Sequence, residues 1–142
     1  MARSLTSSRS KALVRRYFEE LMNKGDLQIA DEIFCQNLVF SDSFLTFHDV
    51  DHVKRYLLMV RRIFPDLHYV ADEPIVQGER IASCFSYEGT VSNSFKDYAL
   101  SERRFKVPGV AVFRLKDAKF AEVHSYFSTY DQLQQLGCLL SR

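Results

Sequence analysis

The sequence predicts an α+β domain in which three N-terminal helices pack on one face of a strongly curved antiparallel or mixed sheet. Two observations predict this class. Apolar residues before Pro65 recur mostly at helical spacing, whereas those from Leu67 onward mostly alternate as they do in strands. Helices followed by a long meander of strands are typical of a domain with its helices on one sheet face. We expect the sheet to close over the helices as a cone with a hollow end, and a short helix to follow the last strand.

Length and composition are those of one globular domain. The chain has 142 residues, of which 46% are hydrophobic and 26% are charged. A chain of this length buries about two-thirds of its unfolded surface. We expect residues 1–10 to be a flexible, serine-rich lead-in and residues 11–142 to form a single domain.

Charge and cysteine content argue against several classes of function. A net charge of +1 provides no large field for a polyanion, so nucleic acid is not an expected partner. No apolar run approaches the ~20 residues that span a bilayer, so we expect no membrane partner. Three widely spaced cysteines without a CxxC motif favour a reduced, cytoplasmic protein. The histidines show no metal-ligand spacing, so we expect no metal.

The first helix is predicted to begin near Ser8 or Ser10, where a hydroxyl can accept an unpaired backbone N–H. It should end at Gly25, which can adopt the left-handed conformation. Asp26 can then cap a second helix. The inward stripe of the first helix consists of Leu13, Val14, Tyr17, Phe18, Leu21 and Met22. The second helix is expected to bury Leu27, Ala30, Ile33 and Phe34.

A short strand and a third helix follow. The strand at 38–40 is predicted to place the polar residues 41–43 at one end of the sheet. Asp49 or Asp51 can cap the third helix, and Pro65 stops it. The inward stripe of this helix consists of Val53, Tyr56, Leu57, Val60 and Phe64.

The rest of the chain is strand-like. Residues 67–77 and 80–91 are predicted to form a hairpin around a Gly-Glu turn, and residues 104–115 and 119–128 form a second hairpin. Between them, the polar segment 92–102 is expected to be a mobile loop beside a pocket mouth. The last helix should end at Gly137.

Five short motifs occur in one order along residues 11–137. They are Val14-Arg-Arg-Tyr-Phe-Glu19, Asn23-Lys-Gly-Asp26, Phe64-Pro-Asp-Leu67, Phe113-Arg-Leu-Lys-Asp117 and Gln135-Leu-Gly137. Together they resemble the SnoaL-like polyketide cyclases, within the nuclear-transport-factor-2-like (ketosteroid isomerase-like) superfamily. The resemblance implies a cone-shaped fold with an apolar cavity, usually assembled as a dimer or tetramer. It also implies cofactor-free closure of polyketide rings by aldol condensation.

The acid–base positions that the resemblance implies carry other residues here. The family's aspartate in the last strand falls at Ser125, or at Tyr126 if the alignment slips by one residue, and its partner histidine falls at Ala111. A second acidic position, common in near relatives, falls at Ser128. Serine and alanine cannot act as a base near neutral pH. We therefore do not expect the cyclase mechanism of the family to apply unchanged.

Three residues are candidates for catalysis instead. Asp42 follows a buried strand and could shuttle a proton at the cavity wall, or it could cap its own turn. Tyr17 or Tyr56 could place a hydroxyl in the pocket and aid Asp42, or these hydroxyls could find purely structural partners in the core. His124 could act as a base. However, strand alternation puts it on the face opposite Ser125 unless a bulge intervenes, so an interface role is the alternative.

We expect a small hydrophobic molecule to be bound mainly by aromatic side chains. The predicted lining consists of Phe40, Tyr56, Phe64, Phe85, Tyr87, Phe113, Ser125, Tyr126 and Phe127. An open cavity favours a cofactor-free isomerase, cyclase or dehydratase. A filled cone favours a non-catalytic binding or interaction module. Cys84, Val110 and Val112, on the second face of the late strands, favour a homodimer.

Overall fold

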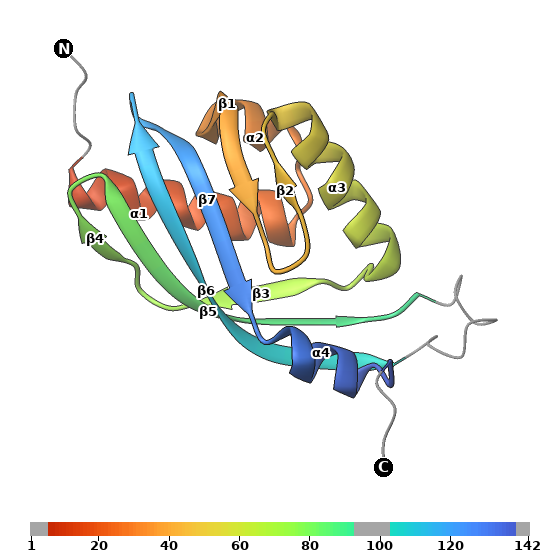
Figure 1. Ribbon diagram of the computed structural model, residues 1–142. Coiled ribbons are helices and arrows are strands. Elements are labelled where there is room, and N and C mark those ends of the chain that lie inside the picture. The colour runs from red at the N-terminus through yellow and green to blue at the C-terminus, as the bar shows by residue number, and fades with distance from the viewer. Residues whose placement is uncertain (1–5, 93–102, 139–142) are drawn as a thin grey trace.

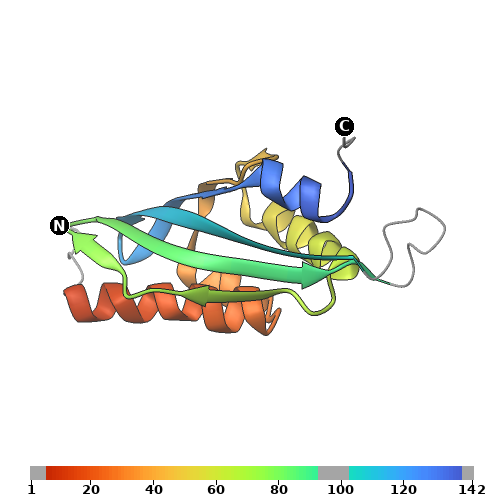
Figure 2. The ribbon, with the colours of Figure 1, turned by 90° about the horizontal axis from the view of Figure 1, so that it is seen from below.

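The computed structural model describes residues 6–92 and 103–138. Within these ranges the chain forms one curved sheet with helices packed against it (Figure 1). Figure 2 shows the N-terminal helix lying along one side of the sheet. The predicted α+β class is confirmed. The segment 93–102, which we expected to be a loop at a pocket mouth, lies outside the described residues.

Five helical segments are described. They are α1 (Ser7–Arg15), η1 (Arg16–Asn23), α2 (Gln28–Ile33), α3 (Val50–Ile63) and α4 (Thr129–Gln135). α1 and η1 follow each other without a break, and η1 has the wider π-helical turn, whose last bond runs from Lys24 N–H to the Glu19 carbonyl over 3.2 Å. The third helix is capped by Asp49, which accepts the His52 N–H, as one of the two predicted caps.

The predicted start of the first helix was wrong by a few residues. Thr6 is the capping residue, because its hydroxyl oxygen accepts the Arg9 N–H over 3.2 Å, and the helix begins at Ser7. Ser10 lies inside the helix and is buried. Residues 7–10 therefore belong to the folded domain and not to a flexible lead-in.

The strands form a single mixed sheet in the order β2-β1-β7-β6-β5-β3, with β4 also paired to β5. They are β1 (Phe34–Ser41), β2 (Thr46–Phe47), β3 (His68–Ala71), β4 (Ile75–Gln77), β5 (Arg80–Thr90), β6 (Arg104–Lys116) and β7 (Lys119–Phe127). All paired strands are antiparallel except β1 and β7. This parallel pair brings the end of β1 beside the end of β7, with Ser41 opposite His124.

Two predicted boundaries need correction. Phe34, assigned to the second helix, is the first residue of β1 and pairs with Phe120 of β7. The Phe34 side chain is buried, as it would also be at the end of a helix. Its apolar character therefore could not show that pairing with β7 extends the strand to this residue. The predicted strand at 67–77 is two strands, β3 and β4, separated by residues 72–74. Pro74 lies in this break and lacks the N–H that a central strand position needs.

Aromatic side chains fill most of the space between the helices and the sheet. Phe113 packs edge-on against Tyr17, with ring centroids 5.1 Å apart, and against Phe120 at 4.7 Å. Phe85 packs against Phe18 and is likewise buried. Phe85 and Phe113 were predicted to line a ligand site, but they belong to the packed core.

Candidate functional site

Asp42 lies where β1 ends, and its two carboxylate oxygens have different partners. Oδ1 accepts the backbone N–H groups of Phe44, at 2.8 Å, and Leu45, at 3.0 Å, which closes the turn before β2. Oδ2 accepts the hydroxyl of Tyr56, which α3 presents to it. The sequence left open whether Asp42 caps a turn or lies at the cavity wall, and the structure shows both. Oδ1 caps the turn, and Oδ2 points toward the interior and accepts from Tyr56.

A small cavity lies beside this pair. Its volume of about 20 Å³ is enough for about one water molecule. It is lined by Tyr17, Met22, Phe40, Asp42, Tyr56, Leu57, Val60, Tyr69, Tyr87, Ser125 and Phe127. The hollow cone that we expected is therefore nearly filled, because inward aromatic side chains from the helices and the sheet meet in its centre.

Tyrosine hydroxyls surround Asp42 and stay protonated. Burial raises the pKa of Tyr17 well above its ordinary value, a hydrogen bond with Ser125 opposes this shift, and the charge of Asp42 adds to it. The pKa of Tyr56 is raised by burial, by its hydrogen bond to Asp42 and by the charge of Asp42. Burial also raises the pKa of Tyr87, and the charge of Asp42 adds to that shift, although a hydrogen bond from Gln132 opposes it. The site thus combines one carboxylate with neutral O–H groups, which can donate to a ligand oxygen.

Ala111 and Ser125 lie opposite each other on β6 and β7, and both face the interior. The Ser125 side chain borders the cavity. The two positions at which the resemblance implies acid–base groups are therefore neighbours at the site, and they hold a methyl group and a hydroxyl.

His124 and Tyr126 do not reach the cavity. Strand alternation places both on the outer face of the sheet, where Tyr126 is 55% exposed. His124 Nδ1 lies 2.6 Å from Ser41 Oγ, and its Nε2 lies 3.3 Å from a carboxylate oxygen of Glu122. The predicted contribution of His124 and Tyr126 to the pocket was wrong because no bulge shifts β7 between Glu122 and Phe127.

A larger apolar groove lies next to the cavity. Tyr56, Val60 and Tyr87 line both spaces, so the groove and the cavity are adjacent. The groove has a volume of about 240 Å³. It is lined by Phe44, Leu45, Tyr56, Met59, Val60, Ile63, Phe64, Tyr87, Gln132, Leu133 and Leu136. Phe64 and Tyr87 were predicted ligand contacts, whereas the residues from α4 were not predicted, since nothing local in the sequence indicates where that helix docks.

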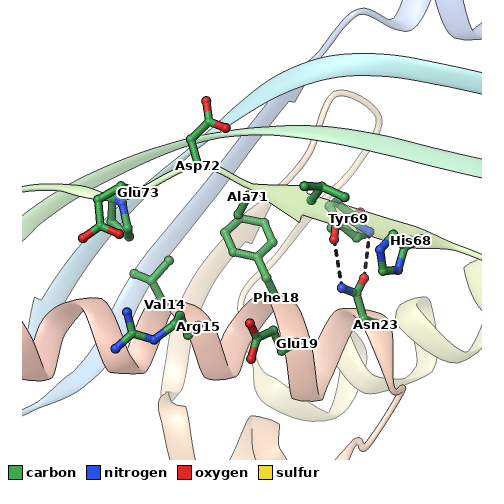
Figure 3. A pocket seen from close by; sticks show the side chains of 12 residues that line it. Val14, Arg15, Phe18, Glu19, Asn23, His68, Tyr69, Ala71, Asp72 and Glu73 are labelled. Atoms are coloured by element: carbon green, nitrogen blue, oxygen red, sulfur yellow. Dashed lines mark hydrogen bonds between the residues drawn. The ribbon is translucent and has the colours of Figure 1, made fainter.

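A larger cleft lies elsewhere, between the N-terminal helix and β3 (Figure 3). Its volume is about 340 Å³, and polar side chains make up half of its lining: Arg15, Glu19, Asn23, His68, Asp72 and Glu73. Asn23 fastens the end of η1 to β3, because its amide accepts the Tyr69 N–H at 2.7 Å and donates to the Tyr69 carbonyl at 2.9 Å. Figure 3 shows this pair of bonds at one end of the cleft. The Asn23 motif therefore has a structural role, and the cleft lies apart from Asp42.

Across residues 6–92 and 103–138, no group of three His, Cys, Asp or Glu side chains is arranged to hold a metal ion. In the same ranges, no helix is both long and apolar enough to cross a bilayer.

The sequence and the fold were compared with those of known proteins. A family model described as SnoaL-like polyketide cyclase matches residues 12–136. The chain belongs to this family. No curated protein matches this SnoaL-like chain.

Solved structures share the cone-shaped, nuclear-transport-factor-2-like fold. A SnoaL-like polyketide cyclase described as putative, from Jannaschia sp. CCS1, superposes with a TM-score of 0.81 at 16% identity, covering 99% of both chains. The wild-type putative polyketide cyclase IdmH from Streptomyces antibioticus gives 0.75 at 21% identity, covering 91% of this chain and 98% of its own. An epoxide hydrolase from M. tuberculosis gives 0.73 at 13% identity, covering 92% and 91%. At these identities the likeness establishes the fold of this SnoaL-like protein and not its reaction.

Proposed function

We propose that this protein binds a small apolar molecule in the groove between α3, α4 and the β1–β2 turn, with one polar end directed toward Asp42 and Tyr56. The observation that carries the proposal is an apolar groove that shares Tyr56, Val60 and Tyr87 with the small cavity beside Asp42. A volume of about 240 Å³ lies just below the ~300–1,000 Å³ typical of ligand pockets. The groove therefore suits a molecule of one or two rings.

Filling the groove tests this proposal. We expect Met59→Trp to weaken binding of the fluorescent probe 2-methoxynaphthalene at least about tenfold, because the indole occupies the space of the ligand. Leu58→Trp is the matched control, since Leu58 lies on the same helix, is similarly exposed and does not line the groove. Fluorescence titration measures both affinities, with the matched control carrying the same added tryptophan. Equal affinity for both variants would contradict binding in the groove.

We further propose that Asp42 transfers a proton on the bound molecule without a cofactor, although the nearly filled cone by itself favours the non-catalytic alternative. The support is its position among neutral tyrosine hydroxyls, which can hold a developing oxyanion while a carboxylate takes a proton from carbon. Ala111 and Ser125 supply no base, so Asp42 replaces the groups that the resemblance implies. The reaction class is an isomerisation, cyclisation or dehydration that proceeds through an enolate.

We also propose that the outer face of the sheet forms a homodimer. Cys84, Val110 and Tyr126 are cross-strand neighbours there, and Val112 continues the apolar surface on the same strand. No described element covers this face. Exposed apolar surface of this kind in a sheet is typical of an interface.

A single carboxylate introduced at the centre of the proposed interface should dissociate the homodimer. We expect light scattering at micromolar concentration to give a dimer mass for the native protein and a monomer mass for Val110→Glu, because the carboxylate would be desolvated at the centre of the interface. Leu58→Glu, on helix α3, should remain dimeric. A monomeric native protein would rule out the interface.

A further inference from the structure

Gln132 on α4 has one amide atom without a partner. The side chain is 3% exposed. Its Nε2 donates to the Tyr87 hydroxyl over 3.2 Å, whereas its Oε1 has no hydrogen-bond partner among the residues that the structure describes. A buried acceptor without a partner is unfavourable. Gln132 lines the groove, so a ligand group there can supply the missing donor.

The position of Gln132 is fixed by its neighbours on the same helix. Gln135 clamps α4 to β6, since its Oε1 accepts the Lys106 N–H at 2.6 Å and its Nε2 donates to the Lys106 carbonyl at 3.1 Å. Leu136 is buried at the end of the helix and also lines the groove. The Gln132 amide is thus held in place before any ligand arrives, which reduces the entropy lost on binding.

The charges around the site restrict the class of ligand further. Among the residues that the structure describes, Asp42 is the only carboxylic acid that lines the cavity or the groove, and no described lysine, arginine or histidine lines either space. An anion would therefore enter a site with a like charge and no counter-ion, which is unfavourable in a partly buried space. A neutral molecule avoids this cost.

We infer that Gln132 selects the ligand by accepting a hydrogen bond from it, so that the ligand is a neutral one- or two-ring molecule carrying a hydroxyl or N–H donor. This inference rests on the proposed binding in the groove. Gln132 contacts the donor through Oε1 while its Nε2 remains bonded to Tyr87. The Tyr87 hydroxyl, which accepts from Gln132, keeps its own proton to donate to a second ligand oxygen.

Two probes of the same shape test the inference. 2-Naphthol carries a hydroxyl donor, and 2-methoxynaphthalene carries the same oxygen without the proton. We expect the native protein to bind 2-naphthol about tenfold more tightly, the effect of one buried hydrogen bond in place of an unpaired acceptor. Gln132→Met should reduce this ratio to about one. Gln134→Met makes the same change at an exposed position of the same helix and should keep the native ratio.

The outcomes distinguish a failure of this inference from a failure of the proposed binding in the groove. Equal affinity of the native protein for the two probes, or a preference for 2-naphthol that survives in Gln132→Met, would overturn the role of Gln132 and leave binding in the groove intact. Failure of both probes to bind would instead overturn the proposed function. The native comparison needs no variant, so equal affinity for the two probes overturns the role of Gln132 even if Gln132→Met does not fold.

Discussion

We expect the free energy of unfolding to fall by about 3–5 kcal/mol for each pH unit above about pH 10. The cause is the set of tyrosines around Asp42. In the unfolded chain a tyrosine ionises near pH 10, whereas in the folded protein the pKa values of Tyr17, Tyr56, Tyr69 and Tyr87 are raised, first of all by burial. The unfolded state therefore loses protons first. Stability is fully present below about pH 10 and is lost as the pH rises above it.

Each such hydroxyl contributes about 1.4 kcal/mol per pH unit between its two pKa values. Tyr17 and Tyr87 are buried and should contribute fully, whereas Tyr56 and Tyr69 are partly exposed and should contribute less. Urea unfolding at several pH values measures the slope, and tyrosinate absorbance reports ionisation. Tyr87→Phe should make the slope shallower by about 1.4 kcal/mol per pH unit, roughly a third of the total, since it removes one of the two groups that contribute fully. If all seven tyrosines ionise while the protein stays folded and equally stable, the four tyrosines near Asp42 are open to solvent, and this prediction is wrong.

Asp42→Asn is expected to slow proton abstraction from carbon at least about 100-fold, the lower end of what a positioned base contributes. Asparagine suits the change because its oxygen can still accept the N–H groups of Phe44 and Leu45, so the turn remains while the charge is lost. 2-Tetralone is a suitable probe, being a neutral bicyclic ketone with acidic C–H bonds beside its carbonyl. The carboxylate takes a proton from carbon, the electron pair passes to the carbonyl oxygen, and a tyrosine hydroxyl stabilises the enolate. In deuterated water a deuteron then returns to carbon.

Deuterium incorporation measured by NMR gives kcat/KM for this exchange. Asp51→Asn is the matched control, because Asp51 is an exposed aspartate in the first turn of α3 and does not line the site. Full exchange by Asp42→Asn would assign Asp42 to the turn alone. A native protein without exchange activity would remove the proton-transfer proposal and leave the binding proposal unaffected.

Local signals in the sequence located part of the site. Tyr17 and Tyr56 recur on inward helical stripes, and both line the cavity. The alternation of β7 correctly separated Ser125 from His124, because successive side chains of a strand point to opposite faces. The polar residues after the predicted strand also placed Asp42 at the end of β1. Each of these predictions depends only on residues close together in the chain.

Contacts between segments that are distant along the chain could not be predicted from the sequence. The Asp42–Tyr56 bond joins residues 14 apart, and the Gln132–Tyr87 bond joins residues 45 apart. The start of β1 at Phe34 also depends on a distant partner, since β7 lies far along the chain. Gln132 could have been noticed as a polar residue on the inner side of a short amphipathic helix, although its free oxygen could not.

The sequence by itself determined the α+β class, the family and the side chains that face inward, because periodicity and short motifs report which face a residue occupies. Only the tertiary structure decided that the cone is nearly full, with about 20 Å³ left beside Asp42 and about 240 Å³ in the groove outside it. The physical reason is that periodicity shows which way a side chain points but not how much empty volume remains between side chains. The space that remains depends on how side chains from separate helices and strands interdigitate at close packing.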